Sequence, residues 1–191
     1  MTRQFSTDIA FTPAVKATQD ALGSRAKMDV MSQRRGFQTE ITDDLRAFLE
    51  RADSFYLASA SADGRPYIQH RGGEPGFVRI DGPATISIPD YPGNAQYITL
   101  GNLSENNRVS LFFMDYETKS RIKIWGRARA EALTDRDARR IVFDIEAWDV
   151  NCPKHIPDRF RPETVARAQE KLLERIAELE REVERLGGSA A

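Results

Sequence analysis

The chain has 191 residues, of which 40% are hydrophobic and 30% charged, enough apolar material for one domain with appendages. Its net charge of -1 provides no overall field to attract nucleic acid or an anionic membrane, so we expect neither as a partner. The single cysteine excludes an internal disulfide and a multi-cysteine metal site, and the lack of a long apolar run or a secretory signal favours a cytoplasmic protein.

Residues 1–40 are predicted to form an N-terminal helical arm. Thr12 supplies a capping hydroxyl before Pro13 at the first helical position, and this helix should end near Gly23. Thr42 then caps a short helix at the start of the next domain. The apolar residues that share one face of that helix are Leu45, Phe48 and Leu49.

Residues 41–160 are predicted to form a mainly β domain with flanking helices. Its strand-like segments are short, with tight turns between them, and cover residues 54–60, 66–71, 77–80, 84–88, 108–114 and 121–131. Six such strands indicate a closed or nearly closed antiparallel barrel. One helix is expected over residues 93–103, across the barrel's end, and another from Thr134, with Ile141, Val142 and Ile145 as its buried stripe.

Residues 161–191 are predicted to form a C-terminal amphipathic helix and a short tail. The helix should run from Pro162 to Leu186, before Gly187-Gly188. Its apolar residues step by four and three in a heptad pattern: Leu172, Ile176, Leu179, Val183 and Leu186. This stripe can pack on the same subunit or on a partner, and a subunit contact is favoured.

The strand from Arg121 to Ala130 alternates strictly. Its small and aliphatic residues, Ile122, Ile124, Gly126, Ala128 and Ala130, should face the barrel interior. The other face carries Arg121, Lys123, Trp125, Arg127 and Arg129. We interpret Arg127 and Arg129 as a solvated surface, and Arg121 and Lys123 as contacts for an anionic ligand. Binding of single-stranded nucleic acid on this face is an alternative that the net charge disfavours.

Three other features suit a phosphate. His70 and Arg71 run into Gly72-Gly73, whose backbone can approach an anion closely. Gly93 precedes a predicted helix, whose free amides favour negative charge. The neutral donors nearby are Asn94, Gln96 and Asn102, and the aromatics available for stacking are Tyr97, Trp125 and Trp148. Together they predict a planar ligand that bears a phosphate.

A protein nucleophile or a metal is less well supported. Cys152 and His155 lie on one segment, whereas the members of a catalytic dyad normally come from separate segments. A zinc site of Cys152, His70 and His155 lacks a fourth ligand. The chain has no P-loop and no G-x-G-x-x-G after a strand. A cofactor that brings its own reactivity is therefore favoured.

Several motifs carry a family resemblance over about residues 40–160. They are Asp63-Gly64-Arg65-Pro66, His70-Arg71-Gly72-Gly73-Glu74-Pro75-Gly76-Phe77, Ile88-Pro89-Asp90-Tyr91-Pro92-Gly93-Asn94, Gly101-Asn102-Leu103 with Asn107-Arg108-Val109, the strand Arg121–Ala130, and the ending Trp148–Ile156. The chain resembles the pyridoxamine 5'-phosphate oxidase-like, FMN-binding split-barrel family. The oxidase's own Ser-Arg-Lys and terminal Arg-Leu-His-Asp-Arg runs are absent, so the resemblance does not extend to oxidation of vitamin B6 phosphates.

The resemblance implies a six-stranded split barrel that forms a homodimer, with FMN held in two equivalent clefts at the subunit interface. The residues it places at the FMN phosphate are Gln69, His70, Arg71, Asn94, Gln96 and Thr99. It assigns Arg121 and Lys123 to the flavin edge. The residues it assigns to closing the cleft are Trp148, Asn151 and His155.

We therefore expect an FMN-dependent oxidoreductase that transfers a hydride to or from a small substrate through flavin N5. Arg121 or Lys123 is the candidate for stabilising the reduced flavin. His70 or His155 is the candidate proton donor, and a cap on a loop carbonyl explains each histidine equally well. The alternative is a non-catalytic flavin- or haem-binding protein on the same barrel, with one of these histidines as the haem ligand.

Overall fold

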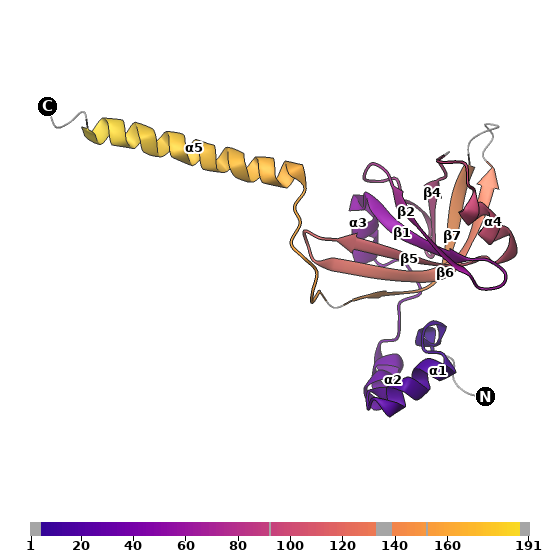
Figure 1. Ribbon diagram of the computed structural model, residues 1–191. Coiled ribbons are helices and arrows are strands. Elements are labelled where there is room, and N and C mark those ends of the chain that lie inside the picture. The colour runs from indigo at the N-terminus through magenta and orange to yellow at the C-terminus, as the bar shows by residue number, and fades with distance from the viewer. Residues whose placement is uncertain (1–4, 92, 133–138, 152, 188–191) are drawn as a thin grey trace. The chain divides into compact units, whose positions relative to one another are not determined.

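The computed structural model describes residues 5–91, 93–132, 139–151 and 153–187 (Figure 1). It divides into two compact units, Met1–Asp115 with Ser120–Pro153, and Tyr116–Lys119 with Lys154–Ala191. Within the described ranges, no helix has both the length and the apolar character needed to span a membrane.

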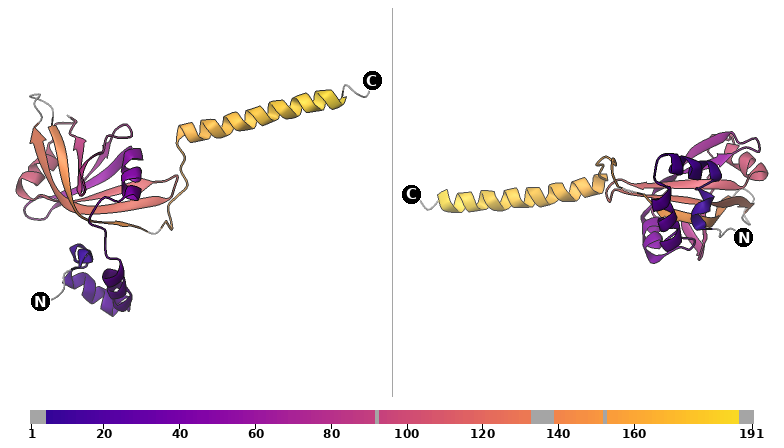
Figure 2. Two further views of the ribbon diagram at one scale, coloured as in Figure 1. Left: turned by 180° about the vertical axis from the view of Figure 1, so that it is seen from behind. Right: turned by 90° about the horizontal axis from the view of Figure 1, so that it is seen from below.

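An antiparallel sheet of seven strands curls around the core of the first unit (Figures 1 and 2). The strands are β1 (Ser54–Ala60), β2 (Pro66–Gly72), β3 (Arg79–Gly82), β4 (Thr85–Pro89), β5 (Arg108–Asp115), β6 (Ser120–Ala132) and β7 (Arg139–Val150). They lie in the order β2-β1-β5-β6-β7-β4-β3, so β2 and β3 are the edges of an open, split barrel. The predicted mainly β fold with flanking helices is confirmed.

The seventh strand, β7, corrects the predicted count of six. Ile141, Val142 and Ile145 were expected on a helix, but they lie in a strand that pairs with β6 along its whole length. Their spacing fits one face of a helix, yet Phe143, Ile145 and Ala147 are buried at alternate positions, which is the period of a strand. Their β-branched and aromatic side chains favour the strand. The expected start of that helix at Thr134 lies outside the described residues.

The helix α3 (Asp43–Arg51) contributes three residues to the core. It begins as predicted after Thr42, whose hydroxyl accepts a hydrogen bond from the Leu45 amide. The face predicted to be apolar is buried against the strands: Leu45, Phe48 and Leu49. At the centre of the core, the rings of Phe55 and Phe113 stack with their centroids 4.7 Å apart.

The N-terminal arm contains a 3-10 turn, η1 (Ser6–Ile9), and two helices, α1 (Pro13–Ala21) and α2 (Arg25–Arg34). Thr12 caps α1 as predicted. The sequence did not predict α2, because its few apolar residues share no face. After α2, the chain packs against β6 and β7: Phe37 stacks on Trp125 at 5.1 Å, and Trp148 Nε1 donates to the Glu40 carbonyl at 2.8 Å.

The crossing helix α4 (Ile98–Glu105) starts five residues later than predicted. Ala95 and Tyr97 adopt left-handed backbone conformations, with φ of 59° and 51°. A right-handed helix excludes such residues, so 93–97 form an irregular loop instead. Gly93 and Asn94 therefore lie in a loop and not at the helix N-terminus.

The second unit joins the turn Tyr116–Lys119 to the helix α5 (Pro162–Gly187). Lys119 Nζ lies 2.7 Å from Asp158, and the guanidinium of Arg159 lies 4.6 Å from the centre of the Tyr116 ring. The predicted long C-terminal helix is confirmed, and it contains no buried residue in its described part.

Candidate functional site

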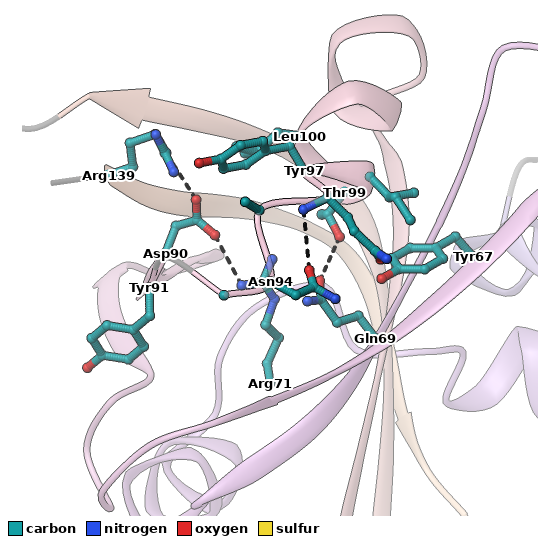
Figure 3. Close-up of a pocket in the computed structure, with 14 residues that line it drawn as sticks. Tyr67, Gln69, Arg71, Asp90, Tyr91, Asn94, Tyr97, Thr99, Leu100 and Arg139 are labelled. Atoms are coloured by element: carbon teal, nitrogen blue, oxygen red, sulfur yellow. Dashed lines mark hydrogen bonds and ion pairs between the residues drawn. The ribbon is translucent and has the colours of Figure 1, made fainter. Parts of the chain in front are cut away.

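A pocket lies between β2, the loop after β4, the start of α4 and β7 (Figure 3). Five of the residues predicted at a cofactor phosphate line it: Gln69, Arg71, Asn94, Gln96 and Thr99. Two lining residues that no prediction assigned to the site are Asp90 and Arg139.

Asp90 connects two arginines in this pocket. Arg71 Nη1 and Arg139 Nε donate to its two carboxylate oxygens, each at 3.1 Å. The hydrogen bond to Asp90 raises the pKa of Arg139, so this guanidinium stays charged. Two positive charges around one carboxylate leave the group with a net positive charge, which favours an anionic ligand.

The Nε atom of Arg71 is buried and has no hydrogen-bond partner in the part of the chain that the structure describes. Buried N–H groups in proteins are almost always hydrogen-bonded, so this donor is open to a ligand. Beside it, Thr99 Oγ1 donates to Gln69 Oε1 at 2.9 Å. Because the Gln69 oxygen faces Thr99, the amide nitrogen of Gln69, which is a hydrogen-bond donor, points away from Thr99.

His70 lies on the opposite face of β2 from Gln69 and Arg71. Side chains alternate along a strand, and His70 is exposed and does not line the pocket. Its ring instead packs edge-on against Tyr56, its neighbour on β1, at 5.7 Å. The alternation of β2 was readable in the sequence and would have separated His70 from the phosphate residues.

The Gly72-Gly73 segment was predicted to approach an anion closely. Gly72 ends β2 and does not line the pocket. The amide of Gly73 donates to the Asp53 carbonyl at 2.9 Å, so this hydrogen bond already uses its donor.

The outward face of β6 carries Arg121 and Lys123, as predicted. Strand register places His70, Tyr56, Phe112 and Lys123 in one row across four strands. Arg121 lies two residues before Lys123 on β6, and therefore on the same face of the strand. The outer row is thus separate from the pocket, on the other side of β2.

Arg121 and Asn151 supply two further buried atoms that lack a hydrogen-bond partner among the described residues. Arg121 Nε and Asn151 Oδ1 have no hydrogen-bond partner within the described ranges. Their backbones are joined, because the Asn151 amide donates to the Arg121 carbonyl at 2.9 Å. A donor and an acceptor are therefore both open to a ligand at the adjoining ends of β6 and β7.

The remaining cations of β6 are paired on the surface, as expected. Arg127 lies 3.0 Å from Glu146, and Arg129 lies 2.5 Å from Asp144. The alternation itself is confirmed from Ile122 to Ala128, whereas Ala130 is exposed rather than buried.

The cleft-closing roles of Trp148 and His155 stay predictions. Trp148 is only 5% exposed and does not line the pocket. His155 belongs to the second unit, with a left-handed φ of 65°. Cys152 lies outside the described residues, and among those that are described no three His, Cys, Asp or Glu side chains gather where a metal ion would fit.

Arg139 was not predicted as a site residue, because residues 139–145 were expected on a helix. The pairing of β4 with β7 ends where Pro89 lies opposite Arg140. Just beyond it, the Asp90 amide donates to the Arg139 carbonyl at 2.9 Å, so these two residues are neighbours. Asp90 did stand in a recognised motif, between Pro89 and Tyr91, but nothing in the motif alone indicated its ion pairs.

No curated protein matches the chain. Among solved structures, it is similar to a putative pyridoxamine 5'-phosphate oxidase from Lactobacillus delbrueckii, with 15% identity over 59% of this chain and 95% of the other and a TM-score of 0.47. It is also similar to HupZ of Group A Streptococcus (16% identity, 63% and 99%, TM-score 0.46) and to the haem storage protein HutZ of Vibrio cholerae (15%, 58% and 94%, TM-score 0.44). The model of the pyridoxamine 5'-phosphate oxidase family matches residues 41–182, so this chain belongs to that family.

Proposed function

We propose that this protein is an FMN-dependent oxidoreductase that works as a homodimer, with the cofactor at the subunit interface. The observation that carries the proposal is the group of Arg71, Asp90 and Arg139, which combines net positive charge with an unpaired buried N–H. Membership of the family supports the phosphate of a flavin as the anion that binds there.

The phosphate of FMN would be held in the pocket. Arg71 would donate through its Nε, and Arg139, whose side chain is 33% exposed, would add a second charge. Hydrogen bonds from charged donors to phosphate oxygens are among the strongest in proteins. Gln69, Asn94 and Thr99 would complete the shell with neutral groups.

Within one chain the outer face of β6 is separate from the pocket, so the ring of an FMN whose phosphate lies in one subunit's pocket would lie against the outer face of the other subunit. A flavin's pyrimidine edge presents carbonyl oxygens beside an N–H, which matches the donor of Arg121 and the acceptor of Asn151. Bound FMN supplies hydride transfer through its N5 atom. The positive charges of Arg121 and Lys123 would stabilise negative charge on the ring. His70, exposed in the same outer row, would donate or accept a proton at the substrate.

Exposed apolar side chains on this face support the subunit contact. Tyr56 and Ile68 are 42% and 65% exposed, and both belong to the outward side of β1 and β2. Large apolar groups clustered on a surface mark interaction sites, and a two-fold dimer would cover the same patch on both copies.

The test is a titration of FMN followed by flavin fluorescence. Losing a charged hydrogen bond costs about 1.5–3 kcal/mol, so Arg71→Ala should weaken FMN binding roughly 10- to 100-fold. The exposed Arg129 is the matched control, and Arg129→Ala should bind FMN like the wild type. Riboflavin, which lacks the phosphate, should bind both variants equally and shows that the Arg71→Ala site is still folded.

Equal FMN affinities for the two variants would overturn the phosphate assignment. Purified wild-type protein that binds no flavin would overturn the proposed cofactor, and a Soret band in its absorbance spectrum would favour the haem-binding alternative. Reduction of the bound flavin by NADH or NADPH would identify the electron donor.

A further inference from the structure

The helix α5 presents a long apolar stripe. Its aliphatic side chains are between 44% and 68% exposed: Leu172, Ile176, Leu179, Val183 and Leu186. A stripe of this length is unusual on a free surface and marks an interaction site. Helices of this kind draw most of their stability from packing of the apolar face, so the stripe needs a partner.

The residue types along the stripe specify the kind of partner. Its heptad positions extend to Val165 and Gln169, giving Leu172, Leu179 and Leu186 at d and Ile176 and Val183 at a. β-Branched residues at a, combined with Leu at d, favour parallel coiled coils of two strands. The stripe therefore fits a second copy of itself.

The charges beside the stripe agree with this arrangement. Arg175 occupies a g position and Glu180 the following e position. In a parallel pair, g of one helix lies beside the next e of the other, so Arg175 would meet Glu180 of the second copy, twice by symmetry. Within one chain Arg175 pairs with Glu178 at 2.8 Å, an exposed contact that is weak enough to exchange.

Gln169 sets the direction of the two helices. In a parallel pair in register, it faces Gln169 of the second copy, and the two amides can bond to each other. In an antiparallel pair with full overlap, it would face Leu186 and lose its hydrogen bonds on burial.

We propose that α5 pairs with α5 of a second copy of this chain as a parallel, two-stranded coiled coil in register at Gln169. This surface belongs to the second unit, and the proposal does not depend on flavin binding. If the barrels also associate, the tether raises the effective concentration of the two helices, which offsets the shortness of the coil.

The test uses the full chain with its single cysteine replaced, Cys152→Ser, and a new cysteine from Gln169→Cys. A disulfide requires Cα atoms about 4.4–6.8 Å apart, which facing core positions of a parallel pair satisfy. Mild oxidation should convert most of this variant to a cross-linked dimer on a non-reducing gel. Lys171→Cys in the same background, at the outward c position, is the control and should remain a monomer on the gel.

Charge variants test the register. Adding Arg175→Glu places two glutamates opposite each other and should abolish the Gln169→Cys cross-link. Adding Glu180→Arg as well restores opposite charges and should restore the cross-link. Circular dichroism of each variant checks that the helix persists. An antiparallel pair would leave Gln169→Cys uncross-linked, since positions 169 and 186 lie about 25 Å apart along the helix, and would cross-link only Gln169→Cys/Leu186→Cys. That result, or no cross-link at all, would overturn the proposal. FMN titration of the same samples reports on the proposed cofactor independently.

Discussion

Arg71 donates a hydrogen bond to Asp90 over 3.1 Å, and these side chains are only 12% and 6% exposed. Arg71 lies on β2 at one edge of the sheet, whereas Asp90 follows β4 near the other. Arg139 of β7 binds the same carboxylate. The contact thus links the edge strand β2 to the segment after β4, beside the proposed phosphate pocket.

Asp90→Ala should lower the free energy of unfolding by about 3–5 kcal/mol, because removing one partner leaves buried charge unpaired. Urea unfolding measures the change. Glu146→Ala is the control, since Glu146 pairs with Arg127 on the exposed surface, where such pairs contribute about 0–1 kcal/mol. If the two variants lose the same stability, the Arg71–Asp90 contact is no stronger than a surface pair.

Gly126→Ala should destabilise the barrel by roughly 3 kcal/mol. Gly126 lies at a register shift between β6 and β7, and a Cβ there would overlap the carbonyl oxygen of Asp144, which belongs to rigid backbone. Gly101→Ala, in α4, meets no atom within 4 Å and should stabilise the protein by about 0.5–1 kcal/mol. Thermal or urea unfolding of the pair should therefore show shifts of opposite sign, and shifts of equal sign would contradict this account.

Phe37→Ala should detach the arm from β6. Phe37 is buried, and its ring stacks nearly parallel to that of Trp125, with 6° between the ring planes. Removing a buried Phe costs about 3–5 kcal/mol. Exposure of Trp125 should also shift the tryptophan emission to longer wavelength. Phe160→Ala, at a site 63% exposed, should change neither quantity.

Acid should weaken the arm through Asp8. The hydrogen bond from Lys16, together with that from the Phe5 amide, lowers the pKa of Asp8 below its ordinary 3.8. A lowered pKa in the folded state contributes stability that is complete above the unfolded pKa and is lost as pH falls through the folded one. The difference in unfolding free energy between the wild type and Asp8→Asn should therefore be constant above about pH 5 and shrink below pH 3.8.

The comparison needs a matched carboxylate. Asp20→Asn, on the exposed surface of the same arm, is the control for removing a carboxylate from the arm. A pH-independent difference for Asp8→Asn would show that the Lys16 contact is absent in solution.

The sequence by itself determined those features whose signal lies within a few residues. Thr12 and Thr42 mark helix starts because a capping hydroxyl acts on the next turn. The alternation from Ile122 to Ala128 and the heptads of α5 follow equally from local periods. The family resemblance also assigned Gln69, Arg71 and Thr99 to one site, and all three line the same pocket.

Only the tertiary structure decided the secondary structure of residues 141–145 and which residues line the pocket. The spacing of Ile141, Val142 and Ile145 fits a helix and a strand alike, and pairing with β4 and β6 selected the strand. That pairing brings Arg139 to Asp90, 49 residues away in sequence, and Asp90 to Arg71, 19 residues away. No local period encodes such contacts, because they form only when the sheet curls around the core and brings β2 close to the segment after β4.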